Sequence, residues 1–213
     1  MSLSIEFASW RDQQAHWPAH GRHILAQHDD EHVVVYQAYR PEIAEHVVRH
    51  QRFGGPWSLD RMTWIKPNFL SMMYRCGWAT KPGQEHVLAV WLPRDVFEQE
   101  ILARAVHSSY SAEPYGSREA WQEAVKRSDV RLQWDPDHGP GGNALERRAI
   151  QLGLRGAATR AFANEWVRRI EDVTPFVREQ RAYLHDLERL QTPRERVLEV
   201  RSPKTRAWLG LSS

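Results

Sequence analysis

The stretch from Arg61 to Gln84, RMTWIKPNFLSMMYRCGWATKPGQ, constrains the fold most, because it joins the densest apolar run of the chain to several cationic side chains. A short strand is predicted over residues 63–65, and Pro67 stands where a helix can begin without losing a hydrogen bond. The apolar residues that follow, as far as Tyr74, leave this helix with almost no polar face, which is typical of a buried helix. We therefore expect the rest of the chain to pack around it.

Charged side chains cannot enter a core unpaired, so the cations of this stretch should lie around the two ends of the helix, in water or facing an anion. They are Arg61, Lys66, Arg75 and Lys81. Cys76 lies inside the apolar run, and we interpret it as an inert core thiol rather than a nucleophile. The stretch thus suggests an anionic ligand but no particular reaction.

The chain has 213 residues, of which 41% are apolar and 26% are charged, which is enough for one substantial core. The longest apolar run, Val87 to Leu92, is far shorter than the roughly 20 residues that a membrane span needs, and the N-terminus lacks the features of a signal peptide. A single cysteine excludes an internal disulfide framework and fits a reducing compartment. We therefore expect a cytoplasmic protein with no membrane partner.

The periodicity predicts one α+β domain, with a mixed and largely antiparallel sheet, helices packed on it and a C-terminal helical pair separated at Thr174-Pro175. We divide the chain into a polar lead-in (1–31), the domain (32–200) and a tail (201–213). The predicted strands cover 32–39, 63–65, 86–92, 130–134, 148–154 and 197–200. The lead-in histidines are interrupted by Pro18 and Gly21, so we expect no metal site.

Polar side chains gather at the ends and on the less apolar faces of these strands. In VRLQW and RAIQLGL the alternation places Gln133 and Gln151 opposite the apolar face, and Gly153 should leave room beside Gln151. If the strands are neighbours, such residues line one cleft. The candidate set comprises Tyr36, Gln37, Tyr39, Arg40, Thr63, Trp64, Lys66, Arg75, Lys81, Gln133, Trp134, Asp135, Arg147, Arg148 and Gln151.

These residue types suit a nucleotide or a nucleic acid. Arginine and lysine bind phosphate, amides contact base edges, and rings such as those of Trp64 or Trp134 stack on a base. Residues 144–213, where Lys and Arg outnumber Asp and Glu, are compatible with an anionic partner. The alternative is a half-solvated sheet face in a structural or interaction protein. The glycine-rich connection DPDHGPGGNALER matches neither a P-loop nor a Rossmann fingerprint.

Three segments carry a family resemblance: VVVYQAYRPEIAEHVVRHQRF, RMTWIKPNFLSMMYRCGWATKPGQEHVLAV and VRLQWDPDHGPGGNALERRAIQLGLRG. They resemble a bacterial and fungal family catalogued as a domain of unknown function, family 4291, from about Val33 to Thr174. The resemblance implies membership of that family and supplies no activity.

A shorter segment, in which a strand ending in Tyr-X-Ala leads into Pro-X-Ile-Ala and a helix, also resembles the opening of ADP-ribosyltransferase folds. That resemblance implies a split antiparallel sheet holding NAD in a cleft, with Gln37 and Gln151 at the catalytic positions. Those enzymes carry His or Arg where this chain has Gln37, and many carry a late glutamate where the nearest candidate is Gln151. Because a neutral amide stabilises a cationic transition state poorly, a non-catalytic RNA- or DNA-binding module is the alternative.

Overall fold

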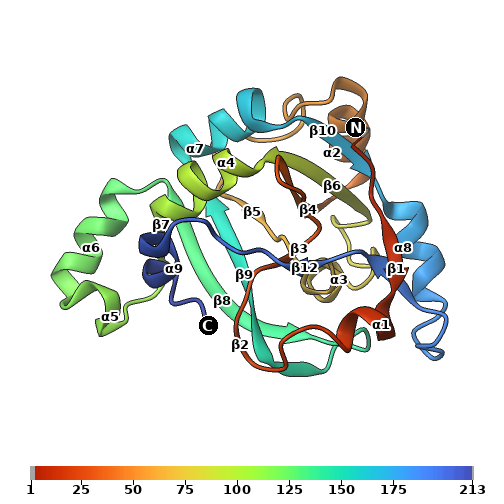
Figure 1. Cartoon of the computed structure of the whole chain (residues 1–213). Helices are drawn as coiled ribbons and strands as arrows, with labels where there is room; N and C mark the ends of the chain where they lie inside the picture. Colours follow the sequence, from red (N-terminus) through yellow and green to blue (C-terminus); the bar gives the residue numbers. More distant parts are fainter. Residues whose placement is uncertain (1–2, 213) are drawn as a thin grey trace.

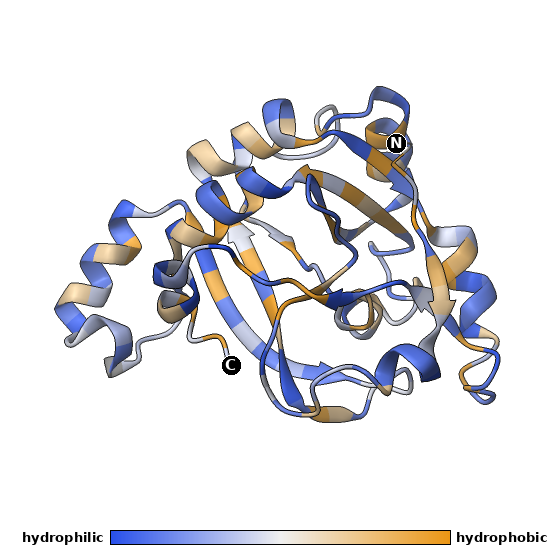
Figure 2. Ribbon diagram, in the orientation of Figure 1, coloured by the Kyte–Doolittle hydropathy of each residue, from blue (hydrophilic) through white to orange (hydrophobic). Residues whose placement is uncertain are grey.

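Two long antiparallel strands, β4 (His32–Tyr39) and β6 (His86–Pro93), form the centre of the fold in the computed structural model, which describes residues 3–212 (Figure 1). Both strands are runs of branched apolar residues and are buried on both faces, as is typical of an inner strand. Figure 2 shows β6 as hydrophobic along most of its length. On its other edge β6 pairs with β10 (Arg169–Asp172).

A second sheet is built around the long hairpin of β8 (Val130–His138) and β9 (Ala144–Leu154). β7 (Ala105–His107) pairs with β8 in parallel, whereas β5 (Thr63–Ile65) and β2 (Gly21–Arg22) share the other edge of β9. The backbone of Lys66, just after β5, bridges to Tyr36 of β4 and so links the two sheets. The expected α+β domain with largely antiparallel sheets is therefore confirmed.

Helices bury both faces of the central sheet in two apolar cores. The first core lies between the sheets, where Leu88 and Leu152 belong to one cluster with residues of α2 (Pro41–His50) and α7 (Gly156–Ala161). The second core lies on the opposite face of β4 and β6, against α3 (Phe69–Cys76) and α8 (Thr174–Arg181).

The helix α3 is buried as its sequence predicts. Phe69 and Met73 are 0% exposed and Leu70 is 3% exposed, while Trp64 in β5 is only half-buried. The Asn68 side chain caps the helix by accepting from the backbone N–H of Ser71 at 2.7 Å. Of the cations of this stretch, Arg61, Arg75 and Lys81 are exposed, whereas Lys66 is buried and faces an anion, the Asp135 carboxylate at 3.5 Å, which is the alternative that the sequence allowed.

The N-terminal segment runs beside the segment that precedes α9, as the red and blue strands of Figure 1 show. β1 (Phe7–Ser9) pairs with β11 (Gln191–Pro193), and β3 (Leu25–Ala26) pairs with β12 (Arg196–Val197). The remaining helical segments are α1 (Trp10–Gln14), α4 (Arg94–Val96), the π-helical η1 (Phe97–Ile101), the 3₁₀-helical η2 (Leu102–Arg104), α5 (Ala112–Tyr115), α6 (Arg118–Arg127), the π-helical η3 (Phe162–Trp166) and α9 (Pro203–Leu209). Within the described residues, no helix combines the length and apolarity needed to cross a membrane.

The C-terminal third departs from its predicted helical pattern. The stripe that ends at Ile170 is broken because residues 169–172 form β10, and α8 ends at Arg181 rather than continuing through Leu184 and Leu187. The cause of the first difference is tertiary. β6 offers a free edge, and Arg168 donates its backbone N–H to the Trp91 carbonyl at 2.9 Å, so pairing with the sheet outweighs helical periodicity.

Candidate ligand-binding cleft

A cleft of about 680 Å³ opens where the end of β4, the strand β5, the helix α3 and the β8–β9 hairpin meet. We call it the Gln37 cleft. Its chemically distinctive lining residues are Gln37, Tyr39, Arg40, Trp57, Arg61, Thr63, Trp64, Lys66, Arg75, Gln133 and Gln151. Most of the residues that the sequence analysis selected are therefore brought together in one place.

The hairpin supplies Gln133 and Gln151, which are direct cross-strand partners. Because side chains alternate along a strand, this register puts both amides on the face opposite the apolar core. The Gln133 side chain donates from Nε2 to Asp135 Oδ1 at 2.9 Å. The space above Gly153 is filled rather than open, because a Cβ atom there would lie 3.1 Å from the Trp64 ring. Glycine at this position therefore leaves room for the side chains of Met62 and Trp64.

Gln37 is 2% exposed and is held by its amide nitrogen. Its Nε2 donates to Thr63 Oγ1 at 2.6 Å and to the Trp64 carbonyl at 3.2 Å. Its Oε1 has no hydrogen-bond partner among residues 3–212. Buried polar atoms in folded proteins are normally paired, and this acceptor is closed off from solvent, so a ligand reaches it only if the side chains around it shift.

The neighbouring hydroxyl groups continue this network. Tyr39 Oη lies 3.1 Å from Thr63 Oγ1 and accepts from Trp57 Nε1 at 2.9 Å. Burial raises the pKa of the Tyr39 phenol to about 12, so this hydroxyl group stays protonated at physiological pH.

Lys66 is the buried cation of the cleft, with 5% of its surface exposed. Its Nζ lies 3.3 Å from Ser71 Oγ and 3.5 Å from Asp135 Oδ2, both of which are long for a charged donor. Burial lowers the pKa of Lys66, and the attraction of Asp135 offsets this only in part. An anion beside Nζ would supply the charge partner that the protein provides only weakly.

The charge of the lining has one sign. Arg40, Arg61 and Arg75 are exposed, in contrast to the buried Lys66. Among the described residues that line the cleft, none is an aspartate or a glutamate. Asp135 takes part only through its contacts with Lys66 and Gln133.

Several predicted residues lie outside the lining. Tyr36 points to the face of β4 opposite Gln37, as alternation requires, and packs edge-on against Phe69 in the second core. Trp134 packs against the first core and donates from Nε1 to the Leu209 carbonyl at 3.1 Å. Lys81 donates from Nζ to the carbonyl of Arg75 at 2.8 Å, which closes the turn after α3.

Arg147 is also kept away from the cleft, although it lies on the same face of β9 as Gln151. Its guanidinium forms a buried ion pair with Asp137 at 2.7 Å, lies over the Trp17 ring and donates to the Pro18 carbonyl. The N-terminal segment therefore covers it. Arg148 points to the opposite face of β9 and is exposed.

Trp57 was not selected from the sequence, and neither was the loop that carries it. This loop, between α2 and β5, follows Gly54-Gly55-Pro56 and has no periodic pattern, so its contact with Tyr39 gave no local signal. The glycines and proline indicated only a helix end.

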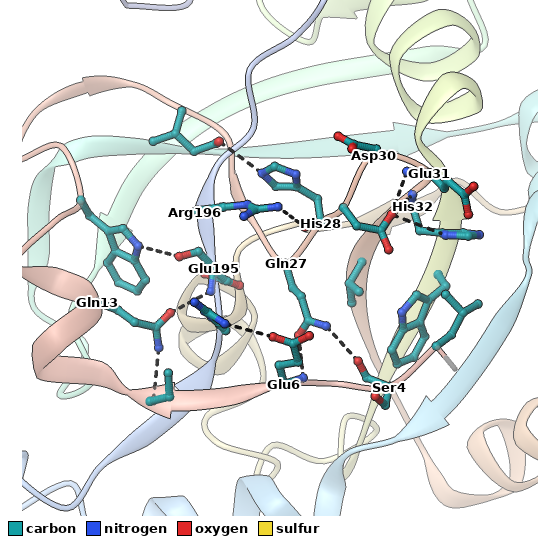
Figure 3. A pocket seen from close by; sticks show the side chains of 18 of the residues that line it. Ser4, Glu6, Gln13, Gln27, His28, Asp30, Glu31, His32, Glu195 and Arg196 are labelled. Carbon is teal, nitrogen blue, oxygen red and sulfur yellow. Dashed lines mark hydrogen bonds and ion pairs between the residues drawn. The ribbon is translucent and has the colours of Figure 1, made fainter. Parts of the chain in front are cut away.

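A second cleft, of about 1070 Å³, lies between the N-terminal segment and the segment around Arg194–Val197 (Figure 3). Its polar groups bind one another: Gln27 donates to the Ser4 carbonyl at 3.0 Å, and Arg194 pairs with Glu6 at 3.4 Å. The lining also carries Asp29, Asp30 and Glu31, so it suits an anion poorly. No cluster of three or more metal-ligating side chains occurs in the described part of the chain.

Comparison with known protein families adds one finding. A family model described as "Domain of unknown function (DUF4291)" matches residues 23–198. The chain belongs to this family. The DUF4291 match contains every residue that lines the Gln37 cleft, whereas α1 and α9 lie outside it. No significant match was found among curated proteins.

Proposed function

We propose that the Gln37 cleft binds a nucleotide. The observation that carries this proposal is the charge pattern of the lining, which combines Arg40, Arg61, Arg75 and the buried Lys66 with no carboxylate among the described lining residues. A buried ammonium group whose nearest oxygen partners are 3.3 and 3.5 Å away gains most from an anionic ligand, because a charge-assisted hydrogen bond is strong where water is excluded.

The size and the neutral groups of the cleft favour a single nucleotide unit over a long nucleic acid. A volume of about 680 Å³ falls within the range of roughly 300–1,000 Å³ for small-ligand sites. Trp64, which is half-buried, supplies an aromatic ring on which a base can stack. Gln133 and Gln151 supply amides that can bind base edges or ribose hydroxyl groups.

We propose binding rather than ADP-ribosyl transfer. The resemblance to ADP-ribosyltransferases would make Gln37 and Gln151 the catalytic residues, and both line the same cleft. An oxocarbenium-like transition state is stabilised by a negative charge, and amides lack that charge. NAD therefore stands among the ligands to be tested, with nicotinamide release as the readout that would add transferase chemistry.

Thermal unfolding with a panel of ligands tests the proposal. NAD, ATP, GTP and short oligonucleotides are compared at low and high salt, because a ligand held by the folded state alone stabilises it by about 2.7 kcal/mol at a hundredfold excess over Kd. We expect a mononucleotide or dinucleotide to raise the Tm. We also expect Lys66→Met to raise the Kd of that ligand by roughly tenfold to a hundredfold, which corresponds to the loss of one charge-assisted hydrogen bond.

Arg148→Ala is the matched control, because it removes an exposed arginine of β9 that lies outside the lining. It should leave the affinity unchanged. The proposal is wrong if no nucleotide stabilises the protein, or if Arg148→Ala weakens binding as much as Lys66→Met does. Stabilisation only by oligonucleotides, with a steep salt dependence, would instead favour the nucleic-acid-binding alternative.

A further inference from the structure

The directions of the hydrogen bonds around Gln37 can be assigned from the groups at the ends of the network. The Trp57 indole N–H can only donate, so Tyr39 Oη accepts from it. A backbone carbonyl can only accept, so the contact with the Trp64 carbonyl identifies the Gln37 amide nitrogen and orients the whole amide. Both ends of the network are therefore fixed.

The middle of the network then contains one hydrogen too many. Thr63 Oγ1 accepts from Gln37 Nε2, and it lies 3.1 Å from Tyr39 Oη. Each hydroxyl group carries one hydrogen, but only one hydrogen can lie between the two oxygens. Whichever hydroxyl donates, the other keeps a hydrogen that has no acceptor among residues 3–212.

The network thus leaves an acceptor and a donor close together. The acceptor is Gln37 Oε1, which has no partner within the described residues, and the donor is the spare hydroxyl hydrogen of the Tyr39–Thr63 pair. All three residues line the cleft and are largely buried, and an unpaired buried polar atom is costly. The charged arginines of the lining, in contrast, are exposed.

We infer that the cleft selects a nucleotide edge on which an exocyclic N–H donor lies beside an acceptor. This inference rests on the proposed nucleotide binding. The edge has the chemistry of an amino group beside a ring nitrogen, as in adenine or cytosine, or of a primary carboxamide, as in nicotinamide. The phosphate then extends toward Lys66 and Arg75, both of which line the cleft.

Matched ligand pairs that exchange an amino group for oxygen test this selection. The pairs are AMP with IMP, CMP with UMP, and nicotinamide mononucleotide with nicotinic acid mononucleotide, with Kd measured by titration calorimetry. Replacing the amino group by oxygen places an acceptor opposite Gln37 Oε1, and in IMP and UMP it also puts a hydrogen on the neighbouring ring nitrogen, so donor and acceptor exchange places. We therefore expect at least a tenfold preference for the amino or amide member of one pair. The pair that shows it distinguishes a nucleobase from a carboxamide.

Gln37→Met removes the acceptor at similar volume and should reduce the preference to less than about threefold. Gln180→Met is the control, because Gln180 is a buried glutamine on α8 outside the cleft lining. It should keep the preference. The wild-type comparison decides the matter even if Gln37→Met does not fold.

Nucleotide binding with equal affinity within every pair, or with a preference for the oxygen member, overturns the inference and leaves the proposed function standing. A preference that persists in folded Gln37→Met also overturns it, because another group must then make the selection. If no nucleotide binds at all, the proposed function fails and the inference fails with it.

Discussion

Arg147 and Lys66 are cations buried to almost the same extent, with 4% and 5% of their surfaces exposed, yet their surroundings differ. The Arg147 guanidinium meets Asp137 through Nε at 2.8 Å and through Nη2 at 2.7 Å, and its remaining nitrogen donates to the Pro18 carbonyl. Lys66 has only two long contacts to its Nζ. Each nitrogen of the Arg147 guanidinium thus has an oxygen partner within 2.8 Å, whereas both partners of Lys66 Nζ lie at 3.3 Å or more.

The groups around the two cations follow the same division. Near Arg147, Glu195 accepts from the Phe69 backbone N–H at 2.6 Å and from the Asn68 amide at 3.0 Å, so the start of α3 is closed by internal bonds. Near Lys66, the oxygen of Gln37 is left without a partner among residues 3–212. Burial alone therefore does not separate a closely paired cation from a weakly paired one, but the number and length of its hydrogen bonds do.

The largest expected effect tests the structural half of this comparison. Arg147→Met leaves Asp137, which is 2% exposed, as a buried carboxylate without its cation, and breaking such a pair costs about 3–5 kcal/mol. Urea unfolding at pH 7 should show this loss. Arg148→Ala, which removes the exposed neighbour, should change the unfolding free energy by less than about 0.5 kcal/mol. Similar small losses for both variants would contradict the assignment of Arg147 as a structural cation.

Sequence periodicity predicted that Gln133 and Gln151 each lie on the less apolar face of their strand, because alternation is local, but it left open that the two strands pair. The same alternation placed Arg147 on that face correctly but could not show that Trp17 and Pro18 cover it. Those two residues come from a polar segment more than a hundred positions away in the chain. Contacts between residues so far apart produce no periodic pattern in the sequence.

The missed strand β10 and the unforeseen burial of Lys66 have the same origin. The segment Arg169–Asp172 continues a helical stripe in the sequence, and only the free edge of β6, supplied by a distant strand, turns it into β10. The burial of Lys66 was likewise missed, because its contact with Asp135 joins the end of β5 to β8. Local patterns identified which residues are polar and on which face, and long-range packing decided which of them are left unpaired.

A second, smaller effect tests whether Lys66 is as weakly paired as its distances indicate. Burial lowers the pKa of Lys66 below its ordinary value of 10.5 in the folded protein. At pH values between the pKa of Lys66 in the folded protein and its pKa in the unfolded chain, the unfolded chain binds more protons. The unfolding free energy of the wild type relative to Lys66→Met should therefore rise with pH in this range. The slope is at most about 1.4 kcal/mol per pH unit.

Urea unfolding from pH 7 to 10.5 measures this difference, and Lys81→Met, which removes an exposed lysine, serves as the control. A difference that falls as the pH rises would mean that the folded state favours the ammonium form. Lys66 would then be stabilised by its protein partners in the way that Arg147 is, and the contrast between the two cations would be lost.

The smallest expected effect concerns Arg75, which lines the cleft as Lys66 does but is exposed. It shows what an exposed cation of the same cleft contributes. An exposed charge near a bound phosphate contributes about 0.2–1 kcal/mol and is screened by salt. Arg75→Ala should therefore weaken the binding of the nucleotide that stabilises the protein in the thermal-unfolding panel. We expect about a threefold loss of affinity at low ionic strength and a smaller loss at high ionic strength, with no change in the urea midpoint. Titration calorimetry at two salt concentrations measures both quantities. A loss as large as that for Lys66→Met, and independent of salt, would mean that the phosphate contacts Arg75 where water is excluded. The proposed difference between the buried Lys66 and the exposed arginines would then be wrong.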